Sequence, residues 1–131
     1  MVQIPEGFRE ILDKPTFVHL ATRGKDGSPQ VSPVWVERDG DTIIVNSAKG
    51  RVKDRNMRAF DRVAISAIDP ENPYRALMIQ GKVVKITEEG ADAHIDKLAK
   101  KYLGKDKYPF RTPTEVRVKY YIEPVHVATM G

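Results

Sequence analysis

The stretch that most constrains the fold is residues 28–62, SPQVSPVWVERDGDTIIVNSAKGRVKDRNMRAFDR. Two apolar, β-branched runs are joined by Asp39-Gly40-Asp41, and Asp-Gly is a strong signal for a tight hairpin turn. Residues 49–62 then carry six basic and two acidic side chains, a net charge of +4 that equals the formal net charge of the whole chain. The stretch therefore predicts two antiparallel strands followed by a short basic helix.

The rest of the chain shows the same short apolar runs separated by turn residues. Alternation and β-branched residues predict strands over residues 16–23, 29–38, 42–46, 63–68, 76–87 and 115–128, the last interrupted at Pro124. Apolar residues at helical spacing predict helices over residues 6–13, 51–60 and 88–103. Strands joined mostly by short turns favour a mainly β, α+β fold, an antiparallel barrel with peripheral helices.

Four places in this pattern have special local chemistry. Pro33 has no backbone N–H for the ladder, so it predicts an edge strand or a bulge whose backbone is open to a ligand. Gly81, inside a long strand, marks a bulge or bend. Residues 69–74 contain two prolines and predict an irregular loop. Ser47 is the expected N-cap of the basic helix.

The length and composition suit one globular domain spanning residues 1–131. Hydrophobic residues make up 40% and charged residues 31% of the chain, which argues against disorder. Because there is no cysteine, disulfides, thiolate nucleophiles and Cys-ligated metals are excluded. The N-terminal residues lack the apolar run of a signal peptide, and no run reaches the roughly 18 apolar residues of a membrane span. We therefore expect a cytoplasmic protein with no membrane association.

The motifs of common catalytic and nucleotide sites are missing from the sequence. His19, His94 and His126 fall on three separate elements without metal-ligand spacing, so we expect no metal site. The serines form no GxSxG elbow, and the glycines form neither GxGxxG nor GxxxxGKS/T. A hydrolase and a Rossmann or P-loop nucleotide site are therefore unsupported.

The junction between the strand ending at residue 46 and the basic helix is the strongest candidate site. It combines polar and basic residues, namely Asn46, Ser47, Lys49, Gly50, Arg51, Lys53 and Asn56. Free backbone N–H groups at a helix start attract phosphate, and Arg51 and Lys53 add charge-assisted hydrogen bonds. The net charge favours an anionic partner but does not choose among a phosphorylated cofactor, nucleic acid and a membrane surface. A solvated face of a basic helix would have the same composition.

The order of the elements resembles the split-barrel flavin-binding family related to pyridoxamine 5'-phosphate oxidase. The shared features are the PQVSPVW strand between two Asp-Gly turns, a short strand ending in Asn-Ser, the KGRVKDRN segment, the DPENPY segment and a long strand with a central glycine. The resemblance runs from about residue 16 to residue 103 and includes GADAHIDKLAKKYLG. Within this family the chain is most similar to the branch that uses the deazaflavin coenzyme F420.

The resemblance implies an antiparallel split β-barrel and a cofactor site. The cofactor-binding residues would be Gln30, Ser32, Pro33, Val34, Ser47, Arg51, Lys53, Asn56 and Tyr74. Arg51 and Lys53 would hold the cofactor phosphate, helped by the side chains at 47 and 56. Residues 30–34 would lie along the tricyclic ring. Members of the family are homodimers with the cofactor between subunits, so Tyr74 would reach the ring bound by the other chain; local packing is the alternative for Tyr74.

The resemblance also implies an activity, the transfer of hydride from coenzyme F420 to a small conjugated or heteroaromatic substrate. FMN is the alternative cofactor, because both molecules offer a phosphate and a tricyclic ring. The acidic tail of the deazaflavin would suit lysines near the third helix, namely Lys97, Lys100, Lys101, Lys105 and Lys107. The C-terminal arginine and histidine motifs of the vitamin-converting oxidases are absent from EPVHVATMG, which argues against pyridoxamine phosphate oxidation. No side chain stands out as a catalytic acid or base.

Two other functions fit parts of the sequence. A non-enzymatic flavin or deazaflavin carrier would bind the cofactor with the same residues. A nucleic-acid-binding barrel would place the basic helix against phosphates, but Phe17, Trp35, Tyr74 and Tyr108 are scattered and form no stacking pair on one strand. We therefore expect a small-molecule substrate and no nucleic-acid partner.

Overall fold

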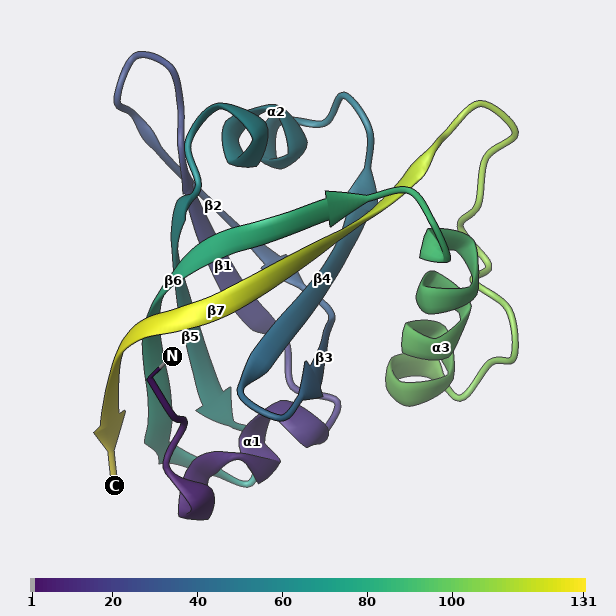
Figure 1. Cartoon of the computed structure of the whole chain (residues 1–131). Helices are drawn as coiled ribbons and strands as arrows, with labels where there is room; N and C mark the ends of the chain where they lie inside the picture. Colours follow the sequence, from purple (N-terminus) through teal and green to yellow (C-terminus); the bar gives the residue numbers. More distant parts are fainter. Residues whose placement is uncertain (1) are drawn as a thin grey trace.

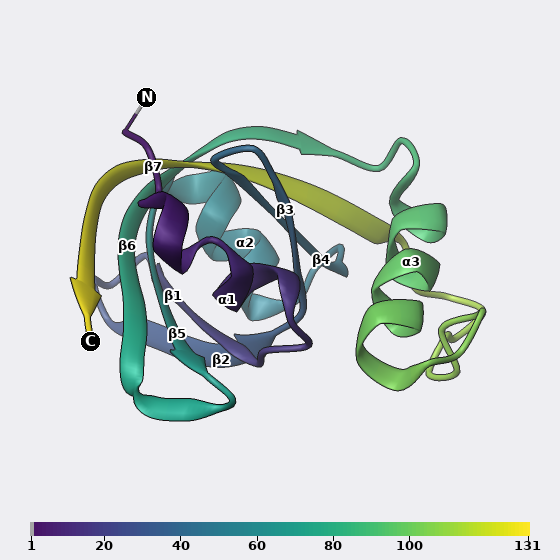
Figure 2. The ribbon, with the colours of Figure 1, turned by 90° about the horizontal axis from the view of Figure 1, so that it is seen from below.

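The computed structural model describes residues 2–131, and within them the chain forms one seven-stranded antiparallel sheet (Figure 1). The strands are β1 (Val18–Arg23), β2 (Pro29–Val34), β3 (Val36–Asp39), β4 (Thr42–Ala48), β5 (Arg62–Asp69), β6 (Asn72–Thr87) and β7 (Arg117–Met130). Their order is β2-β1-β5-β6-β7-β4-β3, so β2 and β3 form the two edges. The sheet curls into a barrel that is split between these edges (Figure 2), which confirms the expected fold.

Helical segments close the ends of the barrel and flank one side. They are the 3-10 turn η1 (Glu6–Phe8), α1 (Glu10–Asp13), α2 (Val52–Ala59) and α3 (Ala91–Leu103). In Figure 1, α1 and α2 lie at opposite ends of the barrel, and α3 stands beside it next to β4 and β7. Buried Ile11 and Leu12 seal one end and Met57 packs at the other. No helix in the described part of the chain is long and apolar enough to cross a membrane.

The run expected as one strand over residues 29–38 is two strands that separate at Trp35. β2 pairs only with β1 in the described sheet, and Pro33 lies opposite His19 on it. Pro33 thus occupies the edge position that its missing N–H predicts. The separation at Trp35 carries the chain from one edge of the sheet to the other.

The prediction of an irregular loop over residues 69–74 is wrong. Only Pro70 and Glu71 lie between Asp69 and Asn72, which pair across a tight turn, and β6 begins at Asn72. The Asp69 carboxylate accepts the Glu71 N–H and the Lys14 ammonium, and these bonds lower its pKa to about 2. Because the Asp69 side chain accepts a backbone N–H of the turn, a hairpin that contains a proline can close in two residues.

The predicted interruption of the last strand at Pro124 is also wrong, because β7 runs without a break from Arg117 to Met130. Pro124 lies opposite Gly81, where the register between β6 and β7 shifts. The bulge confirms the expectation for Gly81 and accommodates the missing N–H of the proline. A Cβ on Gly81 would lie 2.6 Å from the Ile122 Cγ2, so the close approach of the strands requires glycine there.

Ser47 is not the N-cap of α2, because β4 continues to Ala48 and Arg51 stands at the cap position without a side-chain cap bond. Hydrogen bonds to the Asp54 side chain hold the start of the helix instead. The Asp54 carboxylate accepts the Gly50 N–H at 2.9 Å and the hydroxyl of buried Tyr120 at 2.5 Å. Burial would raise the pKa of Asp54, but the bonds from Gly50, Tyr120 and Arg58 lower it below its usual range.

We predict that Tyr120→Phe lowers the free energy of unfolding by about 1 to 3 kcal/mol, because the buried Asp54 carboxylate loses one of its donors. Urea unfolding of the two proteins measures the difference. Tyr121→Phe, which changes the neighbouring half-buried tyrosine on the same strand, is the control and should cost less than about 0.5 kcal/mol. Equal losses for the two variants would contradict the anchoring role of Tyr120.

Candidate cofactor site

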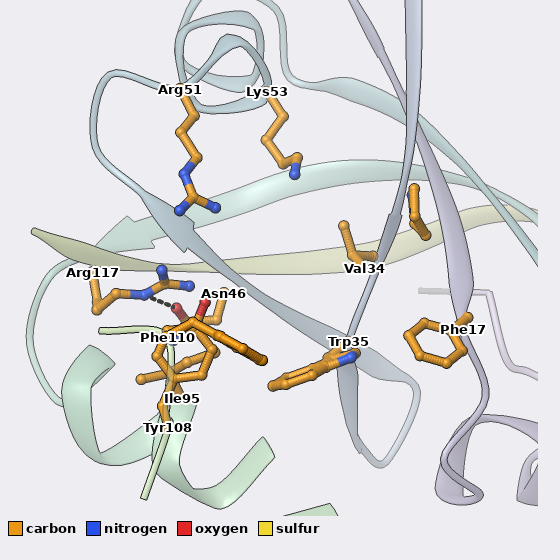
Figure 3. A pocket seen from close by; sticks show the side chains of 11 residues that line it. Phe17, Val34, Trp35, Asn46, Arg51, Lys53, Ile95, Tyr108, Phe110 and Arg117 are labelled. Atoms are coloured by element: carbon orange, nitrogen blue, oxygen red, sulfur yellow. Dashed lines mark hydrogen bonds between the residues drawn. The ribbon is translucent and has the colours of Figure 1, made fainter. Parts of the chain in front are cut away.

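A hollow of about 180 Å³ lies where the split between β2 and β3 meets the start of α2 (Figure 3). The side chains of Arg51, at the cap position of α2, and Lys53, in its first turn, point into the hollow (Figure 3). Asn46 of β4 and Arg117 of β7 also line it. The opposite wall is apolar and mostly aromatic; it contains Phe17, Pro33, Val34, Trp35, Ile95, Tyr108 and Phe110. Phe17 and Phe110 line the hollow yet are 61% and 63% exposed, so the hollow is open to solvent.

The cations are the main electrostatic feature of the hollow. Burial lowers the pKa of Lys53, and the nearby positive charges of Arg51 and Arg117 lower it further. The lining contains no aspartate or glutamate. One carboxylate, Glu115, lies behind two of the cations, 3.7 Å from Arg51 and 3.4 Å from Arg117. Three like charges facing one hollow with a single counter-charge create an anion site.

The aromatic wall is held in a fixed orientation. Trp35 stacks on Tyr102 of α3, with ring centroids 5.2 Å apart and an interplanar angle of 11°. The Tyr102 hydroxyl donates to the Thr16 carbonyl at 2.7 Å and accepts the Val36 N–H at 3.1 Å. Tyr108 meets Trp35 edge-on at 6.0 Å. Tyr102 thus fixes the tryptophan at the point where β2 and β3 separate.

A buried polar network ties the anion site to α3. Asn46 accepts the Nε–H of Arg117 at 2.9 Å and donates to the Ala91 carbonyl and to Nδ1 of His94. Since Nδ1 of His94 accepts, its proton is on Nε2, which lies 3.1 Å from the Glu37 carboxylate. Burial lowers the pKa of His94 to about 4, despite the opposing effect of Glu37. The imidazole is therefore neutral near pH 7.

The structure brings four of the nine predicted cofactor-binding residues together in the hollow, namely Pro33, Val34, Arg51 and Lys53. Gln30 and Asn56 meet elsewhere, through Thr22: Asn56 donates to the Thr22 hydroxyl at 3.0 Å, and that hydroxyl donates to Gln30 at 3.1 Å. They do not line the hollow.

Ser32, Ser47 and Tyr74 complete the predicted set. The Ser32 and Ser47 hydroxyls are buried and have no hydrogen-bond partner in the described residues. Neither residue lines the hollow, although each is next in the chain to a residue that does, because successive side chains of a strand point to opposite faces. Tyr74 is 79% exposed at the start of β6 and is not part of the hollow within one chain.

Sequence reasoning missed Arg117, Trp35, Tyr108 and Phe110 as site residues. Arg117 is far from the basic helix in sequence, but the register places it opposite Ala48, just before the basic turn. Only the β4–β7 pairing could have revealed it. Tyr108 lies in a connection whose backbone is held by Asp96 of α3, which accepts the Tyr108 N–H at 2.8 Å. That connection has no regular pattern to predict from.

The hollow fits a phosphorylated cofactor with a flat ring. Three cations offer charge-assisted hydrogen bonds to a phosphate, and the apolar wall offers surface for a ring.

Comparisons with known proteins identify the family of this chain. The profile of the pyridoxamine 5'-phosphate oxidase family matches residues 4–129, and the chain belongs to that family. A solved structure named F420 reductase is 35% identical, with a TM-score of 0.84, and the match covers 95% of this chain and 98% of that one.

More distant structures share the fold alone. HupZ of group A Streptococcus is 20% identical with a TM-score of 0.66, over 96% of this chain and 93% of that one. A NimC/NimA family protein of Clostridium acetobutylicum is 18% identical with a TM-score of 0.62, over 93% and 87% of the two chains. No curated protein matches the chain.

We predict that the neutral state of His94 makes stability depend on pH. Its pKa is about 4 in the folded protein and about 6.5 in the unfolded chain, so the unfolded state binds the proton more readily. The stabilisation is complete above about pH 6.5 and is lost as the pH falls towards about 4. Between these limits, wild type should lose about 2 to 4 kcal/mol more unfolding free energy than His94→Gln.

Urea unfolding of both proteins at several pH values measures this difference. Lys105→Gln replaces an exposed residue that follows α3 and is the control. Its stability should follow that of wild type at every pH. Parallel pH profiles for wild type and His94→Gln would contradict the assignment.

Proposed function

We propose that this protein is an oxidoreductase that binds coenzyme F420 in the hollow and uses it to reduce a small conjugated or heteroaromatic substrate. The observation that carries the proposal is the convergence of Arg51, Lys53 and Arg117 on an aromatic-walled hollow with no acidic lining. The family membership and the 35% identity to a protein named F420 reductase support the same cofactor. The cytoplasm is the location we propose.

In this proposal the phosphate binds to Arg51, Lys53 and Arg117. The ring lies along Pro33 and Val34 and against the aromatic wall, where backbone groups of the edge strand are free to meet its polar rim. The bound deazaflavin supplies the hydride.

The chain's own residues bind the cofactor, orient it and exclude water from one face of the ring. Trp35, fixed by Tyr102, presents a flat apolar surface, and holding two reactants in place accounts for much of the rate of such reactions. The buried His94 is neutral and engaged with Asn46, and it does not line the hollow. We assign no residue as a proton donor.

FMN is the second candidate cofactor, because the anion site and the ring surface would serve it as well. The lysines near α3 do not favour the deazaflavin as the sequence suggested. Lys97 pairs with Glu37, Lys100 with Asp106 and Lys107 with Asp96. The Lys101 ammonium is half-buried and donates to the Leu12 and Val36 carbonyls, which leaves Lys105 alone without a partner of this kind in the described residues. A non-enzymatic carrier of either cofactor would use the same hollow.

We also propose that the protein is a homodimer whose partner subunit completes the site. Cross-strand neighbours on the outer face of the sheet form two rows, Val31-Ala21-Ala64-Gln80-His126 and Pro33-His19-Ser66-Met78-Ala128. Neither row contains Asp, Glu, Lys or Arg, although these residues make up 31% of the chain. An uncharged exposed face of this extent is typical of a protein interface.

This outer face adjoins the hollow, since Pro33 belongs to both. A second copy seated on it would lie beside the ring site. Tyr74 is exposed on β6, two residues before Ala76 of the same sheet, and is the residue we propose to cross to the partner's ring.

We predict that Arg51→Ala combined with Lys53→Ala weakens binding of coenzyme F420 and FMN by about 3 to 5 kcal/mol, since two charge-assisted bonds to phosphate are lost. Fluorescence titration of the purified proteins measures both affinities. Lys25→Ala combined with Arg62→Ala removes the same charge from exposed positions outside the hollow and is the control. Unchanged affinity in the Arg51/Lys53 variant would rule out the phosphate site.

We predict that Ala64→Glu converts the dimer into a monomer, because it places a charge in the centre of the uncharged face. Sedimentation at micromolar concentration measures the mass. Ala93→Glu makes the same change at an exposed position of α3 and should leave the dimer intact. A wild-type protein that sediments as a monomer would contradict the proposed assembly.

A turnover assay distinguishes an enzyme from a non-enzymatic carrier. Wild-type protein loaded with reduced coenzyme F420 should oxidise it when nitro-heteroaromatic, quinone or enone substrates are added, as followed by the absorbance of the coenzyme. Tight binding without oxidation by any substrate of the panel would favour the carrier.

A further inference from the structure

Glu115 lies directly behind the anion site and has an unusual environment. One oxygen, Oε2, is 3.4 Å from Arg117 and 3.7 Å from Arg51. The other, Oε1, is buried and accepts no hydrogen bond from the described residues. The side chain as a whole is 9% exposed. The carboxylate is therefore only partly compensated, and its negative charge extends into the site.

The Glu115 carboxylate lowers the net positive charge of the anion site. Arg51, Lys53 and Arg117 bring three positive charges, and Glu115 reduces their sum to +2. Its two contacts also hold the guanidinium groups before any ligand arrives. A ligand phosphate must share these two arginines with Glu115, and like charges close together in a partly buried site repel each other strongly.

The two candidate cofactors differ in the charge of their phosphate. In the deazaflavin coenzyme the phosphate is a diester with one negative charge at any pH near neutrality. In FMN it is a terminal monoester, whose second ionisation has a pKa near about 6, so that it carries close to two negative charges at about pH 7.5. Repulsion from a neighbouring carboxylate grows in proportion to the charge of the ligand.

We propose that Glu115 is a specificity-determining residue: it reduces the advantage that the three cations give a doubly charged phosphate monoester over a singly charged diester, and so shifts the selectivity of the site from FMN towards the deazaflavin. The inference rests on the proposed function, because it takes the hollow to be the phosphate site. It assigns the discrimination to one side chain that the phosphate-binding cations themselves hold in place. Those cations attract either cofactor.

Glu115→Gln tests the proposal, because it keeps the size of the side chain and removes its charge. Affinities for coenzyme F420, FMN and riboflavin are measured by titration near pH 7.5. The variant should bind the deazaflavin about threefold more tightly and FMN about tenfold more tightly, since the doubly charged phosphate feels the removed charge twice. Riboflavin has no phosphate, and its affinity should not change. Glu123→Gln makes the same change on β7 outside the hollow, and it should bind all three molecules as wild type does.

A second measurement compares wild type and Glu115→Gln at two pH values, and the affinity for riboflavin reports whether the variant keeps its binding site. Lowering the pH from about 8 to about 5.5 protonates the FMN phosphate to a single negative charge. Because the site keeps a net positive charge, the ratio of FMN to riboflavin affinity should then fall, but by about threefold less in wild type than in Glu115→Gln. The charged or titratable groups around the site are Arg51, Lys53, Glu115 and Arg117, with His94, Glu37, Lys97 and Tyr108 behind them. The pKa of His94, about 4, keeps its imidazole neutral over this range.

Equal tightening of FMN and deazaflavin in Glu115→Gln, or an equal fall of the FMN to riboflavin ratio on acidification in wild type and variant, would overturn the role of Glu115 and leave the proposed function standing. Failure of wild type to bind either phosphorylated cofactor would overturn the proposed function itself, and the specificity role with it.

Discussion

Pairing between β4 and β7 is the interaction on which the candidate site depends. It places Ala48 opposite Arg117 and Asn46 opposite Lys119, and the Lys49 N–H continues it by donating to the Val116 carbonyl at 2.8 Å. The basic turn before α2 and the last strand of the chain therefore start from the same point. Without this pairing, Arg51, Lys53 and Arg117 would be three scattered surface cations.

Buried polar contacts then fix the elements that surround this point. The Tyr120 hydroxyl, from the barrel core, reaches Asp54 and holds the first turn of α2. Asn46 joins Arg117 to α3 through Ala91 and His94. Because these contacts are buried, each carries a large penalty if broken, and they set the orientation of Arg117 and the position of the first turn of α2 before a ligand binds. A preformed anion site binds with less loss of side-chain entropy than a flexible one.

Local chemistry in the sequence predicted much of the fold. Alternating β-branched runs located the strands, Pro33 located an edge, and Gly81 located a bulge. Prediction was wrong where a tertiary contact overrides a local signal. Asp69 closes a tight turn that contains Pro70, the bulge at Gly81 lets β7 pass through Pro124, and Asp54, not Ser47, holds the start of the helix.

The same contrast between local sequence signals and tertiary contacts applies to the site. Arg51 and Lys53 are consecutive members of a charge pattern and were visible as candidates, whereas Arg117 becomes a neighbour only through sheet register. Trp35 and Tyr108 meet through α3 and its following connection, and no spacing in the sequence encodes that contact. Glu115 is an ordinary acidic residue in the sequence and gains significance only between Arg51 and Arg117.

The most direct test of the account is a crystal structure of the protein grown with coenzyme F420. We expect the coenzyme phosphate within hydrogen-bond distance of Arg51, Lys53 and Arg117, with the ring along Pro33 and Val34. A coenzyme whose phosphate lies on another surface, with these three cations unengaged, would contradict the assignment of the site.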